Sequence, residues 1–283
     1  MLWLYLSFVF YTINSLLWKW AVQSEHPISL INRRAVFTFS LVVLSMFLTG
    51  ISWRFVTEPG FYLILWSSFF GTIGLILMVY FLKEGSFTRF SYYSFLGMTI
   101  NGTATLLMGR EQLTTSLVVS MCILLAGYSL FVWDENRSLK KQPLLRSQHL
   151  LLGLMTVMFS TSTLLGWLAM DTFSPLQLMV VQELFVLVTT SLLSLLWLKK
   201  SIPFTTGLKP RYPLMALFIM LAMFTSLTSL QTLNPLVNAI NGVIVPVLTL
   251  LGGVVVFREK MNKVQIVSLI IICIGEVFFI WGR

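Results

Sequence analysis

Two glutamates interrupt long apolar stretches of this sequence, and a carboxyl group in such a place can do chemistry. Glu183 lies well inside the stretch 175–198, and Glu276 lies about two-thirds of the way along 262–282. A carboxylate is costly to bury unless it is paired or protonated. Glu183 and Glu276 are therefore candidate proton-coupling residues. The alternatives are a salt bridge for Glu183 and, for Glu276, contact with water at the end of its helix.

Two basic residues lie near the ends of apolar stretches. Lys19 follows Trp18 near the end of the first stretch, and Arg34 follows Arg33 near the start of the second. One interpretation is that these long side chains extend their charges to a membrane surface. The other is that Lys19 and Arg34 form the basic part of a polar site inside the protein, where they would face Glu183.

Neutral polar side chains recur within the apolar stretches. Asn238 and Asn241 are three residues apart, so they share one face of a helix. Such groups can bind a substrate, or they can join helices through hydrogen bonds. The candidate substrate-binding residues are Lys19, Arg34, Glu183, Asn14, Trp18, Tyr92, Asn101, Asn238 and Asn241.

The sequence contains no nucleotide-binding loop, no cluster with metal-ligand spacing and no nucleophile triad. We therefore expect no catalytic residue, no metal and no cofactor, and we expect that the protein is not an enzyme.

These residues must be positioned by membrane-spanning helices. Hydrophobic residues make up 57% of the chain and charged residues 10%, whereas soluble domains carry about 25% charged residues. A span needs about 20 mostly apolar residues, and the lack of strict alternation excludes barrel strands. The sequence therefore predicts an all-α integral membrane protein with ten transmembrane helices, at 2–22, 29–49, 59–82, 86–108, 113–133, 149–170, 175–198, 211–231, 234–256 and 262–282.

The basic residues are distributed unevenly between the two sides of these helices. Sixteen of the 19 Lys and Arg residues lie at or beside the odd-numbered breaks between stretches, and the other three are Arg54, Arg110 and Arg283. Positive residues are retained on the cytoplasmic side of a membrane. The bias predicts odd-numbered breaks in the cytoplasm and both termini outside. The net charge of +9 thus belongs to loops, and we expect no nucleic-acid partner.

The chain repeats itself with an offset of 148 residues and no gap. The most specific matches are Pro27 with Pro175, Arg110-Glu111 with Arg258-Glu259, Gly127 with Gly275, and Trp133 with Trp281. The repeat divides the chain into two five-helix units, 1–148 and 149–283. Because each unit has an odd number of helices, the second must be inverted relative to the first. Inverted repeats are typical of secondary transporters, whose substrate sites lie between the halves.

The closing segment carries a family resemblance. A helix with an internal proline, Pro246, is followed by Gly252-Gly253, by Arg258-Glu259 at a tight turn, and by Gly275 in the last helix. This order resembles the drug/metabolite transporter superfamily in its ten-helix EamA-like form. The first half has a weaker copy in Arg110-Glu111 and Gly127. The resemblance implies two five-helix repeats, and it implies termini in the cytoplasm, which is the opposite of the charge bias.

These observations predict a secondary active transporter of small polar metabolites, amino-acid-like or other small organic solutes, that works by alternating access. One alternative is a facilitative exchanger without proton coupling, and another is a membrane enzyme or scaffold without transport. The expected partners are a small-molecule substrate and the lipid bilayer, in a monomer or homodimer. We expect a multi-pass protein of a cell membrane of the bacterial inner-membrane type.

Overall fold

The computed structural model describes residues 2–108, 114–139, 144–198, 209–233 and 243–281, and it contains no strand within them. The first half provides α1 (Leu2–Val22), α2 (Pro27–Thr49), the short 3-10 helix η1 (Trp53–Thr57), α3 (Phe61–Glu84), α4 (Phe87–Leu107) and α5 (Thr115–Leu139). The second half provides α6 (Leu144–Ala169), α7 (Pro175–Leu196), α8 (Arg211–Thr232), α10 (Ile244–Phe257) and α11 (Lys263–Trp281). The predicted all-helical architecture is confirmed for these residues.

The second helix of each half begins at a proline. Pro27 opens α2 and Pro175 opens α7, which is the helical position where the missing N–H costs nothing. Ser174 and Gln177 complete a capping box at the start of α7, and this satisfies two backbone donors that the helix itself leaves unpaired. These local signals explain why the predicted boundaries at the two prolines agree with the structure to within two residues.

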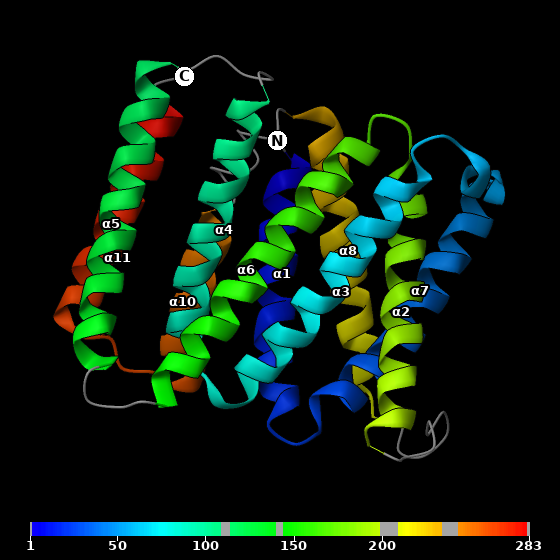
Figure 1. Cartoon of the computed structure of the whole chain (residues 1–283), viewed down its shortest axis with the longest axis horizontal. Helices are drawn as coiled ribbons and strands as arrows, with labels where there is room; N and C mark the ends of the chain where they lie inside the picture. Colours follow the sequence, from blue (N-terminus) through cyan, green and yellow to red (C-terminus); the bar gives the residue numbers. More distant parts are fainter. Residues whose placement is uncertain (1, 109–113, 140–143, 199–208, 234–242, 282–283) are drawn as a thin grey trace.

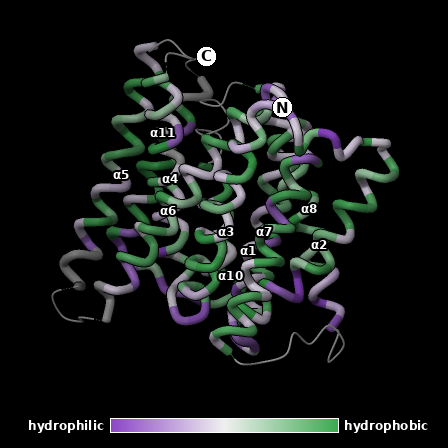
Figure 2. Tube along the Cα trace, turned by 45° about the vertical axis from the view of Figure 1, so that its right-hand side comes forward, coloured by the Kyte–Doolittle hydropathy of each residue, from purple (hydrophilic) through white to green (hydrophobic). Residues whose placement is uncertain are grey.

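Six helices are long and apolar enough to cross a membrane by length and composition: α2, α3, α5, α6, α7 and α8. Among the described residues, α10 is apolar but shorter. Hydrophobic residues predominate along the helices and hydrophilic ones gather near their ends (Figure 2). That all ten helices cross a membrane therefore stays a prediction.

The two halves pack against each other in equivalent pairs. The contacts of α3 with α6 correspond to those of α8 with α1, and the contacts of α2 with α8 correspond to those of α7 with α3. The helices α2 and α7 pack against each other, as do α4 and α10, and α5 and α11. Each of these contacts is preserved when the halves are exchanged at the 148-residue offset. This pattern is the one expected of the internal repeat, which remains a prediction.

The two ends of the bundle differ. The chain enters α1 and leaves α11 at one end, whereas the breaks between α1 and α2, between α3 and α4, and between α10 and α11 lie at the other (Figure 1). We call the second of these the basic end, because most Lys and Arg residues flank such breaks. Which end faces the cytoplasm stays a prediction.

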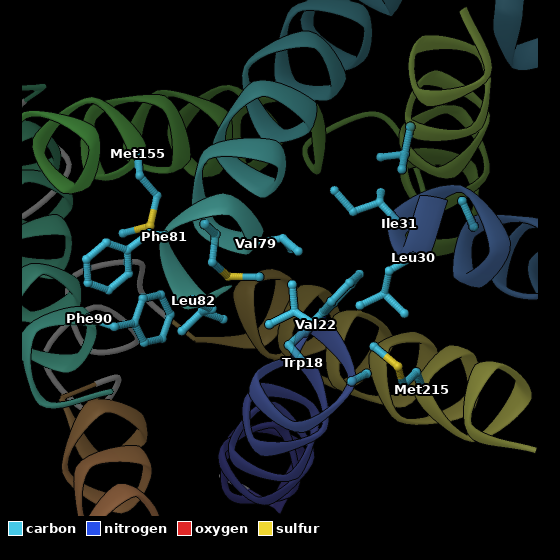
Figure 3. Packing of buried hydrophobic residues seen from close by; sticks show 14 of the residues in the cluster. Trp18, Val22, Leu30, Ile31, Val79, Phe81, Leu82, Phe90, Met155 and Met215 are labelled. Carbon is cyan, nitrogen blue, oxygen red and sulfur yellow. The ribbon is translucent and has the colours of Figure 1, made fainter. Parts of the chain in front are cut away.

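A buried apolar cluster closes the basic end. It is built from the last turns of α1 and α3 and the first turns of α2, α4 and α8, with contributions from α6 (Figure 3). Its members include Trp18, Leu30, Leu82, Phe87 and Tyr212, all of which are at most 1% exposed. We call it the basic-end plug.

Candidate functional site

A cavity of about 410 Å³ lies between the two halves. Small-molecule sites typically measure about 300–1,000 Å³. The described residues that line it come from α1 to α4, α6 to α8 and α10, and none comes from α5 or α11. The cavity extends from Trp18, in the basic-end plug, to Leu4 in the first turn of α1. The two peripheral helices are those that the repeat places last in each half.

Arg34 and Glu183 meet at the wall of this cavity. The Arg34 Nη1 atom donates hydrogen bonds to both Glu183 carboxylate oxygens, at 2.6 and 2.7 Å. Both side chains are buried, at 1% and 3% exposure. The Arg34 guanidinium also lies 5.6 Å from the centroid of the Trp18 ring, where it makes a cation–π contact.

The repeat and the packing together explain this encounter. Under the 148-residue offset, Glu183 corresponds to Ala35, the neighbour of Arg34. Because α2 packs against α7, two nearly equivalent points of the halves face one another. A charge-assisted contact of this geometry is among the stronger polar interactions in proteins.

Several neutral residues of the lining carry a buried polar atom that has no hydrogen-bond partner. These atoms are Asn14 Oδ1, Trp18 Nε1, Asn101 Oδ1 and Thr249 Oγ1, and Arg34 Nε joins them. Buried polar groups in proteins are usually hydrogen-bonded. Their concentration around one cavity is what a site that receives a hydrogen-bonding solute would require.

Small residues on α3, α4 and α6 leave room for the cavity. The hydroxyl groups of Ser67 and Ser162 each donate to the backbone carbonyl of the other residue, at 2.8 and 2.7 Å, and hold α3 against α6. A Cβ at Gly71 would come within 2.8 Å of the Ser162 hydroxyl, which leaves no room for a larger residue there. Such close contacts bring the helix backbones together around the cavity.

Two predicted substrate-binding residues, Lys19 and Tyr92, do not line the cavity. Lys19 is buried but does not line the cavity, since its Nζ donates to the carbonyls of Leu82, at 2.9 Å, and of Gly85. It thereby binds the carboxyl end of α3, where a cation is favoured. Tyr92 also lies elsewhere: its ring stacks on Phe131 with centroids 3.5 Å apart. Neither Lys19 nor Tyr92 is among the described residues that line the cavity, and a role of either in substrate binding stays a prediction.

Tyr93 takes the place that was expected for Tyr92 and lines the cavity. Consecutive helical residues point about 100° apart, so one residue of difference decides which side chain faces the site. Glu276 is only 7% exposed, neither of its carboxyl oxygens has a hydrogen-bond partner, and it does not line the cavity. Asn238 and Asn241 lie outside the described residues.

Sequence reasoning missed a polar stripe on α6. Thr156, Ser160, Thr163 and Trp167 follow one another at spacings of three and four residues, and all of them line the cavity. This spacing places them on one helix face. This spacing can be seen in the sequence. Ser and Thr are also common at helix–helix contacts in membranes, so the sequence alone could not distinguish a cavity lining from such a contact.

A second polar cluster joins the halves at the basic end. Glu25, in the turn between α1 and α2, accepts hydrogen bonds from Arg33 at 3.4 Å, from Lys209 at 3.4 Å, and from Arg211 and Tyr212. Tyr212 also accepts a hydrogen bond from Arg33, at 2.8 Å. The Glu25 carboxylate is 9% exposed. This Glu25 cluster binds the start of the first half to the start of α8 in the second half.

The second half of the chain matches the model of the EamA-like transporter family, over residues 146–281. This half is an EamA-like transporter domain. The resemblance to the drug/metabolite transporter superfamily is thereby confirmed for this half, and the chain is a multi-pass membrane protein that contains a domain of a transporter family. In this EamA-like half, Glu259 accepts a hydrogen bond from the Phe87 backbone N–H at 2.7 Å. Glu259 thus caps the start of α4 in the other half.

One crystal structure of another protein is similar to the whole chain. The TM-score is 0.69 at 14% sequence identity, and the alignment covers 98% of this chain and 99% of that one. At this identity the similarity shows the fold alone. The comparison with curated proteins gave no match.

Proposed function

We propose that this protein is a secondary active transporter of small organic solutes and that it works by alternating access between its two five-helix halves. The observation that carries the proposal is the cavity of about 410 Å³ between the halves, with unpartnered polar atoms in its wall. The equivalent pairing of helices across the halves supports an inverted repeat, and transporters of that design bind substrate between the repeats.

The closed basic end fits one state of such a cycle. The basic-end plug and the Glu25 cluster both join the first half to the second. Opening the cavity toward the basic end would separate these contacts, while the first turn of α1 would close in at the opposite end. A transporter needs two such arrangements of similar free energy, and substrate binding shifts the equilibrium between them.

Coupling to protons would fall to Glu276 more readily than to Glu183. Glu183 is held by two hydrogen bonds from Arg34, whereas the buried carboxyl group of Glu276 has no hydrogen-bond partner. Burial without a hydrogen-bond partner favours the neutral, protonated form of a carboxyl group. A facilitative exchanger would use neither residue in this way, and uptake that does not respond to an imposed pH gradient would favour the exchanger. Proton-driven uptake that persists in a Glu276→Gln variant would remove Glu276 from the coupling step.

Solute flux through purified protein in liposomes tests the proposal. Solutes would first be selected because they raise the melting temperature, since a ligand of the folded state stabilises it. Uptake of a selected solute above that of protein-free liposomes is the expected result. Binding without uptake across a full panel of stabilising solutes would instead indicate an enzyme or a scaffold.

Two glycine variants form a matched pair for this assay. Gly97 lines the cavity, and a Cβ there would meet Ser160 and Thr156 at 3.4 Å, so Gly97→Leu would extend into the cavity. Gly153 has open space around its Cβ position and does not line the cavity. We expect Gly97→Leu to reduce uptake at least tenfold and Gly153→Leu to leave it unchanged. Equal uptake by the two variants would remove the cavity from the transport path.

A further inference from the structure

The charges around the cavity cancel. Among the described residues of its lining, Arg34 and Glu183 alone are charged, and they are bonded to each other. The stretch 234–242, which precedes α10, contains no ionisable residue in its sequence. We propose that the solute bound in this cavity carries no charge, because the closed Arg34–Glu183 pair leaves the described lining without net charge. The proposal rests on the proposed function and narrows its substrate class.

The ion pair is poorly placed to bind a zwitterion. One guanidinium nitrogen already contacts both carboxylate oxygens, and both side chains are almost fully buried. A zwitterion that took Arg34 at one end and Glu183 at the other would first have to break this pair, and each buried charge would lose its partner. A solute with a single charge would find no unpaired counter-charge among the described residues of the lining, although it would still lose its hydration.

The neutral groups around the cavity fit an uncharged solute. Trp18 Nε1 is a donor, the side-chain amides of Asn14 and Asn101 offer donors and acceptors, and the Thr249 hydroxyl can do either. A solute in the cavity can therefore exchange hydrogen bonds at several points without any ionic contact.

The remaining wall is largely apolar and aromatic. It includes Phe8, Phe159, Trp167 and Met223 among the described residues of the lining. Such a wall favours a solute with an apolar body, while the neutral polar groups bind hydroxyl, amide or carbonyl substituents. The substrate class that follows is a small, uncharged, amphipathic organic molecule.

Matched probes of different charge test this inference. One set keeps a phenylpropyl skeleton: 3-phenylpropanamide is neutral, 3-phenylpropanoate is an anion, 3-phenylpropylamine is a cation and phenylalanine is a zwitterion. A second set compares uridine with uridine 5′-monophosphate, and a third compares glucose with glucose 6-phosphate. Affinity is measured with the purified full chain by thermal shift over a range of probe concentrations.

We expect at least one neutral probe to bind, and its charged counterparts to bind at least tenfold more weakly. A charged or zwitterionic probe that binds within tenfold of its neutral counterpart overturns the inference, and so does the failure of every neutral probe to bind. Flux separates this result from the broader proposal. Uptake of a charged probe refutes neutral selection but supports transport, whereas a neutral probe that binds without uptake refutes transport.

Single charges introduced into the cavity extend the test. Asn14→Asp adds a carboxylate that has no cationic partner and leaves the Arg34–Glu183 pair intact. We expect it to raise the affinity for 3-phenylpropylamine at least tenfold relative to 3-phenylpropanamide. Asn101→Asp serves the same purpose if the first variant fails to fold. An unchanged order of affinities in a folded variant would mean that the charge of the cavity does not set selectivity.

A double variant provides the control. Arg34→Met combined with Glu183→Leu removes both charges but keeps the cavity neutral and replaces the ion pair with side chains of similar size. If the net charge of the cavity decides selection, this variant still prefers the neutral probe. Stronger binding of an ion by the double variant than by the unmodified protein would overturn the inference.

Discussion

Removal of one member of the buried ion pair should unfold this protein more easily. In Glu183→Gln, the Arg34 guanidinium loses a carboxylate that it contacts at 2.6 and 2.7 Å, while its side chain remains about 1% exposed. Breaking a buried pair from one side costs about 3–5 kcal/mol, because the other charge stays buried and unpaired. An exposed pair would cost about 0–1 kcal/mol. We therefore expect a loss of about 3 kcal/mol or more.

The assay is reversible unfolding of the purified protein in detergent micelles, followed by circular dichroism. Glu84→Gln provides the control, since Glu84 is exposed at the end of α3, and its stability should change by less than about 0.5 kcal/mol. Arg34→Met and the double variant Arg34→Met/Glu183→Gln complete a cycle that isolates the coupling between the two side chains. If Glu183→Gln loses less than about 1 kcal/mol, Arg34 is effectively solvated from the cavity and the reasoning fails.

Three other predictions concern closure, packing and topology. Glu25→Gln weakens the hydrogen bonds from Arg211 and Tyr212 that join the halves at the basic end. A cysteine that replaces Met78, which lines the cavity, should then react faster with a thiol reagent. The same rate with and without Glu25→Gln would show that this cluster does not close the cavity. Gly127→Leu should destabilise the packing of α5 on α11 by about 1–3 kcal/mol or more, because even a Cβ there would lie 2.7 Å from Ile272. Gly153→Leu should not destabilise the protein, since the space around Gly153 is open. Equal melting temperatures of the two variants would contradict this prediction. The charge bias predicts that a cysteine replacing Trp53 reacts with an impermeant reagent in intact cells, whereas a cysteine replacing Lys83 does not. The reverse result would favour the orientation that the family resemblance implies.

The presence of the helices, and the starts of two of them, followed from local properties of the sequence. Apolar stretches of span length predict helices wherever they occur, and the prolines at 27 and 175 fix where two of them begin. The offset of 148 residues also predicted which helices would be equivalent, and the observed pairs agree with it. The helix predictions succeed because length, hydropathy and capping act within one helix, whereas the repeat stays a prediction.

The composition of the site depended on tertiary structure. The sequence identified Arg34, Glu183, Asn14, Trp18 and Asn101 as candidates, and all of them line the cavity. Hydropathy could not indicate that Arg34 and Glu183 would bond to each other, because this depends on the packing of α2 against α7.

For Lys19 and Tyr92, the sequence did not determine which groups the side chains contact. A lysine near a helix end can extend to water, to a solute or to a carbonyl of another helix, and only the position of α3 made Leu82 and Gly85 its partners. Tyr92 and Tyr93 are chemically identical neighbours, and the rotation of α4 about its axis placed Tyr93 in the cavity and Tyr92 against Phe131. The sequence by itself determined which segments are helices and which side chains could do chemistry. Only the packing of helices from distant parts of the chain decided which of those side chains share a site.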